Sequence, residues 1–456
     1  MVDSKDIKLS LWKIAKFPLA CIICSLSFFT LAFFFFPGVF QIVLYINTIA
    51  MIITMIYAVI FGLIPLFFKR KPKGTLQSEF VSIIIPVFND GEVLEKNLQN
   101  LVKLRYPNYE ILVVYSEKST DSTKEVALKF AQEYPNIHAF SENVSRGYGL
   151  NIGIDNAKGE FLLFLDSDTF IFNDFIEKTL SYFTSPDIKM VNSCFLGLNS
   201  TYNILTRISW SLSNSIAFYG IGINKYLKNI SFMGFGGIWR KKALIECGKF
   251  ATDSVLDDSE LNLRAGVKFP HWKGIFDDNL FCYQFFPTNF KTFYLQQLHW
   301  HLGNFRYSIQ GIRKLKQLGL RQKFLYISQF LAIDIIPLIT LFSLGMIVVQ
   351  FFANFFYPNL SFGGGLFYFG LGILSFAIMF ITMFLFAYPK YRKSPHAKLS
   401  RKTIIGGIFV IIYIVGLIFA VVSLNALKEL FKRKKGQKEV FVKVDKSKLD
   451  YSAIPT

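Results

Sequence analysis

The feature that most constrains this chain is a long stretch without charge near its start. From Phe17 to Phe68 the sequence contains no Asp, Glu, Lys or Arg. A membrane-spanning helix needs about 20 apolar residues, so the stretch is too long for one span and also for the core of a signal peptide. Pro37-Gly38 divides it, which predicts an N-terminal transmembrane hairpin within residues 1–76, with helices at about 17–36 and 41–68.

Basic residues flank both ends of the predicted hairpin and indicate its orientation. Lysines at positions 5, 8, 13 and 16 precede it, and Lys69-Arg70-Lys71 follows it. Because Lys and Arg favour the cytoplasmic side, both flanks are expected in the cytoplasm. A net charge of +19 could suggest a nucleic-acid partner. Here the charge lies beside apolar segments in a chain that is 52% hydrophobic, which predicts an integral protein of the cell membrane without a nucleic-acid partner.

The C-terminal third contains three more apolar segments, at about 324–352, 365–388 and 403–425, followed by a basic tail over 428–456. Before them, residues 304–323 place apolar side chains at helical spacing against a basic face. An ordinary surface helix would show the same pattern, but the apolar segments that follow favour an amphipathic helix lying in the membrane interface. Three full crossings would put the basic tail outside, against the positive-inside rule. Either one segment does not cross fully or the tail is an exception, and we favour a cytoplasmic tail.

The five cysteines do not form an even disulfide framework. Cys21 and Cys24 lie in the first apolar segment and are interpreted as small hydrophobic residues. Cys194, Cys247 and Cys282 are scattered singly, which favours free thiols in a reducing compartment.

Residues 77–303 alternate strand-like and helix-like segments. Strands are predicted over 81–86, 111–114 and 161–165, and helices over 91–104 and 122–134, the second capped by Asp121 or Ser122. This alternation is typical of an α/β domain with a Rossmann-like, mainly parallel sheet covered by helices. We therefore expect a cytoplasmic α/β domain between transmembrane α-helices.

Two carboxylates end the most apolar of these strands. Phe161-Leu162-Leu163-Phe164-Leu165 leads directly into Asp166 and Asp168. Ligands of α/β folds bind at the carboxyl ends of the strands, and paired carboxylates there suit a divalent metal with its phosphates. A turn or helix cap would explain the same residues.

Other polar residues follow the neighbouring strands. Pro86 and Asn89 lie in a turn after the first strand, and Arg146 precedes a Gly-rich segment that could meet a diphosphate. Asp257 and Asp258 begin a helix, where a carboxylate could act as a general base. Each feature alone is commonly a turn or a cap.

Together and in this order, these motifs resemble the family 2 glycosyltransferases of the GT-A fold. The resemblance covers roughly residues 80 to 305 and the flanking spans, and it is greatest to the membrane-integrated synthases of cellulose, chitin, hyaluronan and poly-N-acetylglucosamine. It implies that Asp166 and Asp168 bind Mg²⁺ or Mn²⁺ and the donor diphosphate. It also implies Asp258, beside Asp257, as the catalytic base, and a donor site that includes Pro86, Asn89, Glu117 and Arg146.

The same resemblance implies an acceptor and diphosphate side formed by Gly236, Gln296, Gln297, His299 and Trp300. The sequence differs from the family at two of its motifs. His299 stands where processive members carry the Arg of a Gln-x-x-Arg-Trp motif, and Ser116-Glu117 stands where an Asp-Asp pair holds the donor base. A neutral His is a weaker anion ligand than Arg.

The function expected from the resemblance is that of a membrane-bound, inverting hexosyltransferase. It would move a sugar from a nucleotide-sugar donor to a growing polysaccharide and pass the product through its own helices, with membrane lipid around it. One alternative is transfer of a single sugar to a lipid acceptor such as a polyprenyl phosphate or a ceramide-like lipid. Another is an inactive membrane scaffold subunit.

Overall fold

The structure, a computed structural model, describes residues 2–3, 11–35, 78–210, 227–254, 256–330, 416–432 and 440–441, with a few isolated residues between 38 and 56 and between 381 and 405. Most of the segments predicted to span a membrane at 41–68, 324–352 and 365–388, part of the one at 403–425, and most of the tail over 428–456 lie outside the described residues.

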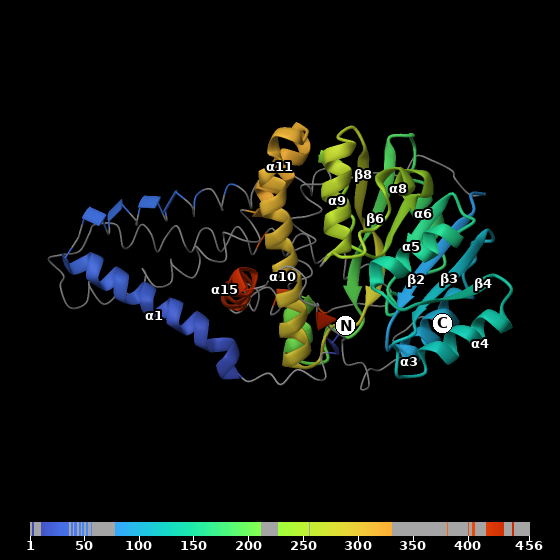
Figure 1. The fold of residues 1–456 in the computed structure, drawn as a ribbon, viewed down its shortest axis with the longest axis horizontal. Coiled ribbons are helices and arrows are strands. Elements are labelled where there is room, and N and C mark those ends of the chain that lie inside the picture. Colours follow the sequence, from blue (N-terminus) through green and yellow to red (C-terminus); the bar gives the residue numbers. More distant parts are fainter. Residues whose placement is uncertain are drawn as a thin grey trace.

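A seven-stranded sheet forms the centre of the α/β domain (Figure 1). Its order is β4-β3-β2-β5-β7-β6-β8, and all neighbours are parallel except β7, which is antiparallel to both β5 and β6. The strands are β2 (Val81–Val87), β3 (Tyr109–Ser116), β4 (Ile137–Glu142), β5 (Phe161–Phe164), β6 (Ile188–Gly197), β7 (Gly237–Arg240) and β8 (Lys273–Gln284). The prediction of a mainly parallel α/β sheet is confirmed.

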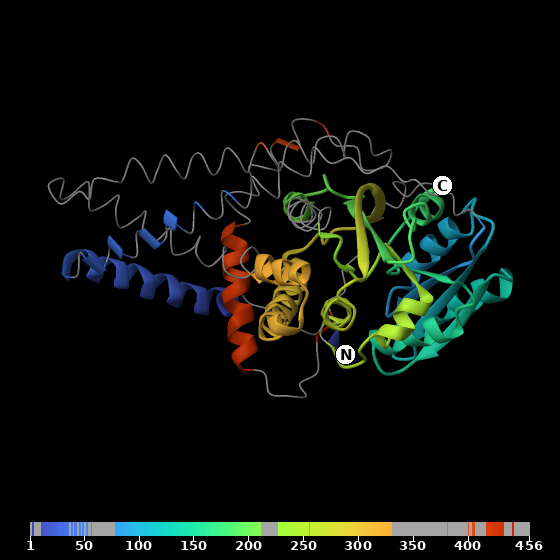
Figure 2. The ribbon, with the colours of Figure 1, turned by 90° about the horizontal axis from the view of Figure 1, so that it is seen from above.

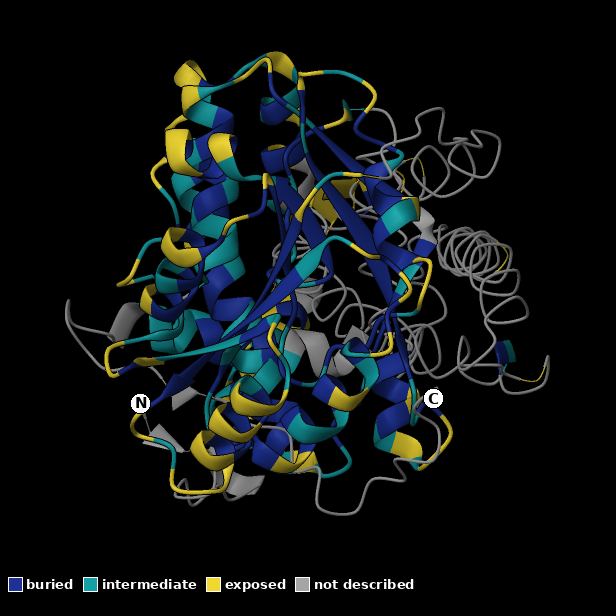
Figure 3. Ribbon diagram, turned by 90° about the vertical axis from the view of Figure 1, so that its right-hand side faces the viewer, coloured by how far each residue is buried: buried dark blue, intermediate teal, exposed yellow. Residues whose placement is uncertain are grey.

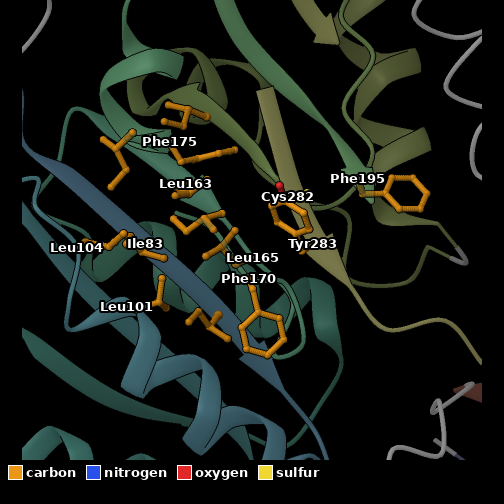
Figure 4. Packing of buried hydrophobic residues seen from close by; sticks show 14 of the residues in the cluster. Ile83, Leu101, Leu104, Leu163, Leu165, Phe170, Phe175, Phe195, Cys282 and Tyr283 are labelled. Atoms are coloured by element: carbon orange, nitrogen blue, oxygen red, sulfur yellow. The ribbon is translucent and has the colours of Figure 1, made fainter. Parts of the chain in front are cut away.

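Helices cover both faces of this sheet (Figures 1 and 3). On one face, residues such as Ile83 and Leu163 pack with α3, α4 and α6. Figure 4 shows part of this core, with Leu101 of α3 and Phe175 of α6. On the other, Ile84 and Leu162 pack with α5, α8 and α9. The central strands β2, β3 and β5 are therefore buried on both sides, which explains why they are mostly apolar. The bounds are α3 (Gly91–Leu101), α4 (Thr123–Glu133), α5 (Arg146–Asn156), α6 (Phe175–Leu180), α8 (Lys241–Cys247) and α9 (Asp257–Lys268).

A layer of helices lies between the α/β domain and the N-terminal helix α1 (Leu11–Phe35) (Figure 1). It consists of α10 (Phe290–Arg313), the short 3₁₀ helix η2 (Leu315–Gln317), α11 (Leu320–Gln329) and α15 (Gly416–Lys432). The segment predicted as one helix over 304–323 is thus divided among α10, η2 and α11, and the predicted domain boundary at residue 303 lies inside α10. The helix begins earlier because Asn289 caps it, accepting a hydrogen bond from the Thr292 backbone N–H at 2.9 Å.

Among the described residues, α1 alone is long and apolar enough to cross a membrane, over Ile14–Leu31. Several of its large side chains are exposed, including Ile23 at 61% and Phe35 at 71%. Its cysteines, Cys21 and Cys24, are free thiols, as are Cys194, Cys247 and Cys282 in the α/β domain. Near the two chain ends, β1 (Val2–Asp3) pairs in parallel with β9 (Val440–Phe441).

Candidate active site

The carboxylates predicted to bind metal lie on a tight turn after β5. The Leu165 backbone N–H still bonds to Ile84 of β2 at 3.1 Å, and the Thr169 N–H then bonds back to the Asp166 carbonyl at 2.9 Å. Asp166 and Asp168 are both partly exposed on this turn. The structure therefore places the pair at the carboxyl end of a central strand, where the sequence predicted a ligand site.

Asn97 and Asp90, two buried residues that the sequence analysis did not single out, hold this turn in place. Asn97 on α3 is fully buried, and its Nδ2 donates to the carbonyls of Ser167 and Thr169 at 3.0 Å each and to that of Asp166 at 3.5 Å. The Ser167 hydroxyl donates to Asp90. A signal was present in the sequence, because Asn97 falls on the apolar stripe of its helix, and a buried amide needs hydrogen-bond partners.

Arg146 joins three parts of the chain. It follows Ser145, whose side chain caps α5 by accepting from the Tyr148 N–H at 3.3 Å. Its Nη1 donates to both carboxylate oxygens of Asp257 at 2.8 Å, and its Nη2 donates to Asp166 Oδ1 at 2.9 Å and to the Gly234 carbonyl at 3.0 Å. Burial lowers the pKa of the guanidinium, but the charges of Asp257 and Asp166 outweigh it and raise the pKa above its ordinary value. Arg146 therefore remains charged and compensates two carboxylates.

The proposed base, Asp258, lies on the first turn of α9. Asp257, Asp258 and Glu260 are all in this turn, where the helix dipole favours negative charge. Asp258 Oδ1 accepts from the Ser259 N–H at 2.7 Å. Burial, followed by repulsion from Asp257, raises the pKa of Asp258 from 3.8 to about 7. A carboxylate with such a pKa can accept a proton near neutral pH.

A glycine loop borders this carboxylate. Gly234 has a φ of +86°, and a Cβ on it would lie 3.5 Å from Asp258 Oδ2. The structure thus brings Arg146, Asp166 and Asp257 into direct contact, with Asp258 beside the same loop. We call these four residues, with Asp168 on the β5 turn, the carboxylate cluster.

The other residues predicted on the donor side lie at the ends of β2, which neighbours β5, and of β3, which neighbours β2. Pro86 is within β2, opposite Val114. Asn89 has a φ of +52°, and its Oδ1 accepts from the Thr120 N–H at 2.6 Å, so its side chain holds the loop after β3. Glu117 begins that loop and pairs with Lys124 at 3.1 Å.

The residues predicted on the acceptor side lie on other elements than the carboxylate cluster. Gly236 is fixed between strands: its N–H donates to Phe164 at 2.8 Å, and a Cβ would come within 2.7 Å of Cys282 Sγ. Gln296, Gln297, His299 and Trp300 all lie on α10, which packs against α9. Gln297 is buried, and its carbonyl bonds to His301 Nδ1 at 2.9 Å.

The carboxylates on the β5 turn suit a cation that substrate oxygens complete. Within the described ranges, no three His, Cys, Asp or Glu side chains gather closely enough to hold a metal alone. Asp166 and Asp168 offer the hard oxygen ligands that Mg²⁺ and Mn²⁺ take, and such ions commonly use one or two carboxylates with substrate phosphates. The turn therefore fits a metal that binds together with a nucleotide.

Comparisons with known proteins agree with this geometry. Residues 82–248 match the family model described as Glycosyl transferase family 2. The poly-beta-1,6-N-acetyl-D-glucosamine synthase of Staphylococcus epidermidis is 24% identical over 84% of this chain and 93% of its own length. A probable glucomannan 4-beta-mannosyltransferase 15 of Arabidopsis thaliana is 24% identical over 71% of this chain and 64% of its own, and its relative numbered 7 is 26% identical over 52% and 47%. This chain thus spans about half to two thirds of the plant relatives.

A solved structure shows the same fold. Mannosyltransferase PcManGT from Pyrobaculum calidifontis, determined in complex with GDP-Man and Mn²⁺, superposes with a TM-score of 0.53 at 16% identity. The match covers 81% of this chain and 100% of that one.

Proposed function

Because the chain is a family 2 glycosyltransferase with the GT-A fold, we propose that it is a membrane-bound, inverting hexosyltransferase that extends a polysaccharide from a nucleotide-sugar donor. The observation that carries the proposal is the Arg146 bridge, which joins the Asp166 turn to Asp257 and so supports a donor site next to the proposed base. The relatives named as glucomannan and poly-N-acetylglucosamine enzymes support a polysaccharide product.

In the proposed mechanism, the chain's own residues orient two substrates and move one proton. Arg146 holds Asp257 and Asp166 in place and offers positive charge beside the donor diphosphate. An oxygen of Asp258 takes the proton from the acceptor hydroxyl as that hydroxyl attacks the anomeric carbon. The new C–O bond forms on the face opposite the breaking bond to the diphosphate, so the configuration inverts. A Mg²⁺ or Mn²⁺ ion on Asp166 and Asp168 would supply Lewis-acid stabilisation of the leaving group's charge.

The membrane arrangement is proposed from α1 and α15. The exposed apolar surface of α1 suits lipid. Figures 1 and 2 show α15 running crosswise to α1, on the side of α1 that faces the α/β domain. There Asn425 Nδ2 donates to the Ile14 carbonyl at 2.9 Å. We propose that α15 lies along the membrane surface, which would make the last apolar segment the one that does not cross fully.

A donor panel tests the proposed activity. Purified full-length protein in lipid would be incubated with radiolabelled GDP-mannose, UDP-N-acetylglucosamine or UDP-glucose, with Mg²⁺ and then with Mn²⁺. We expect transfer from one of these donors into a product excluded on gel filtration. A labelled product that is small and soluble in organic solvent would show that the acceptor is a lipid. His299, which stands where processive members carry an Arg, favours this alternative. Absence of both transfer and donor hydrolysis would contradict the enzyme assignment.

A further inference from the structure

The helix that carries the proposed base is held from α10 through a short hydrogen-bond chain. Ser254, just before α9, donates from Oγ to the Leu256 carbonyl at 2.9 Å. The same Oγ bonds to the Tyr307 hydroxyl of α10. Since a serine hydroxyl has one proton, Tyr307 is the donor in the second bond. Burial raises the pKa of Tyr307 to about 12, so this donor keeps its proton at neutral pH.

A close contact between Leu256 and α10 lies beside this chain of bonds. A Cβ at Gly303 would come within 2.1 Å of Leu256 Cδ1, so this side chain fits against α10 only because position 303 is glycine. Leu256 packs there with Leu263 of α9 and with Tyr307. The residues before Asp257 are thus fixed on α10 by one polar and one apolar contact.

On another side, α9 is fixed to the glycine loop of the carboxylate cluster. Asn262 Oδ1 accepts from the Phe232 N–H at 2.8 Å, and its Nδ2 donates to the Phe232 carbonyl at 2.8 Å. Between α9, α10 and α11 lies a polar cavity of about 40 Å³, lined by side chains that include Ser259, Asn262 and Tyr307. Because this cavity interrupts the packing, the position of the first turn of α9 depends on a few discrete contacts.

The other side of α10 packs against α15 and α1. Leu302 and Phe305 contact Ala426 of α15, and Tyr294 packs with Ile14 of α1. α10 therefore carries four of the acceptor-side residues and contacts both the base-bearing helix α9 and the membrane-side helices.

We infer that Tyr307 is a positioning residue for the proposed base, because its hydroxyl bond to Ser254 sets the first turn of α9, and with it Asp258, from α10. The inference depends on the proposed function. The donor-side carboxylates Asp166 and Asp168 lie on the turn that β5 and α3 hold, so loss of this bond should lower the rate of the chemical step more than donor affinity.

The test is a double-mutant cycle on the full-length enzyme in lipid. Tyr307→Phe and Ser254→Ala each remove one hydroxyl. We expect each variant to lower kcat by about three- to tenfold, as loss of one hydrogen bond would, with the donor KM within about twofold of wild type. The double variant should fall no further than Ser254→Ala, which also loses the bond to the Leu256 carbonyl, because the bond that Tyr307→Phe removes is already broken there.

Tyr326→Phe is the matched control. Tyr326 is a buried tyrosine of α11 in the same apolar cluster, while the hydroxyl that bonds Ser254 is that of Tyr307. This control should keep kcat within twofold of wild type. A Tyr307→Phe enzyme with unchanged kcat, or a double variant whose loss is the product of the single losses, would overturn the inference. A wild type that is inactive with every donor would instead count against the proposed function.

Discussion

Arg146 Nη1 lies 2.8 Å from both carboxylate oxygens of Asp257, although the two residues are more than a hundred positions apart in the chain. The same guanidinium reaches Asp166 through Nη2. A planar cation with several fixed donors can hold two carboxylates at once, which the point charge of Lys does not do. The carboxylate cluster therefore depends on arginine at this position.

Substitution of Arg146 tests that dependence. Arg146→Met leaves Asp257 and Asp166 without their shared cation, and we expect a loss of transfer of about 100-fold, as for a misplaced catalytic group. Arg146→Lys keeps the charge and should retain more activity than Met, yet less than wild type. Initial rates at saturating donor would measure both. Equal activity of the Met and Lys variants would show that the charge of Arg146 is not required.

The pH dependence follows from the environment of Asp258. Burial and the Asp257 charge raise its pKa to about 7, and only the ionised form accepts a proton, so kcat/KM should rise with pH across about 6 to 8 and then level off. Because the charge of Arg146 lowers this pKa, Arg146→Met should move the rise to higher pH. A profile that is flat from pH 5.5 to 9 would contradict the assignment.

The raised pKa of Asp258 also makes the folded state less stable as pH rises, whereas activity increases. Since the folded state favours the neutral carboxyl of Asp258, its contribution to stability falls as pH rises from about 4 to about 7. Thermal unfolding of Asp258→Asn, which stays neutral, should lack this component and give a Tm equal to or above that of wild type at pH 8.

Asn97 provides a test of the predicted metal site from outside it. Asn97→Ala removes the donors that hold the Ser167 and Thr169 carbonyls, and we expect apparent Mn²⁺ affinity to fall by about 10- to 100-fold, as when groups that support metal ligands are removed. Unfolding free energy should fall by about 2 kcal/mol. Mn²⁺ titration followed by EPR, with nucleoside diphosphate present, would measure the affinity.

Asn100→Ala is the matched control for that measurement. Asn100 lies one turn along α3 and donates to the Ile171 carbonyl at 2.8 Å, beyond the β5 turn. Its loss should lower stability and leave Mn²⁺ affinity near that of wild type. Equal affinities for both variants would show that Asn97 does not shape the site.

The parallel pair of β1 and β9 predicts that the two chain ends share one side of the membrane. After replacement of the five native cysteines, a single cysteine would be introduced at Asp3, at Phe441 or at Lys158. Lys158 is exposed on the α/β domain and reports the side on which that domain lies. Membrane-impermeant maleimide should label all three from the same side in oriented vesicles. Labelling of Asp3 and Phe441 from opposite sides would exclude an even number of crossings.

The central strands of the fold could be predicted from the sequence because they are buried on both faces. Val81–Val87 is apolar except for Ser82, Phe161–Phe164 is wholly apolar, and the ends of both strands were located closely. β8 was not predicted, since Lys273–Gln284 includes Asp277, Asp278 and Asn279 and changes register against β6 at two points. The helix α10 was predicted to start too late because along its length it contacts α1, α9 and α15, so its apolar residues do not follow one stripe.

The site could be predicted in its carboxylates but not in their supports. Asp166, Asp168, Asp257 and Asp258 stand out because charged residues at strand and helix ends need compensation. The double role of Arg146 depends on how α5 meets α9, and the Ser254–Tyr307 bond joins residues on a loop and on α10 that no local pattern connects.

The most direct test of the account is the transfer activity of Asp258→Asn, measured together with donor affinity. The account predicts that labelled sugar transfer falls by about 10²- to 10⁴-fold, the usual contribution of a general base, while the donor Kd stays near that of wild type. Asp187→Asn, which changes an exposed carboxylate paired with Lys273, should transfer normally. Near wild-type transfer by Asp258→Asn would contradict the proposed mechanism.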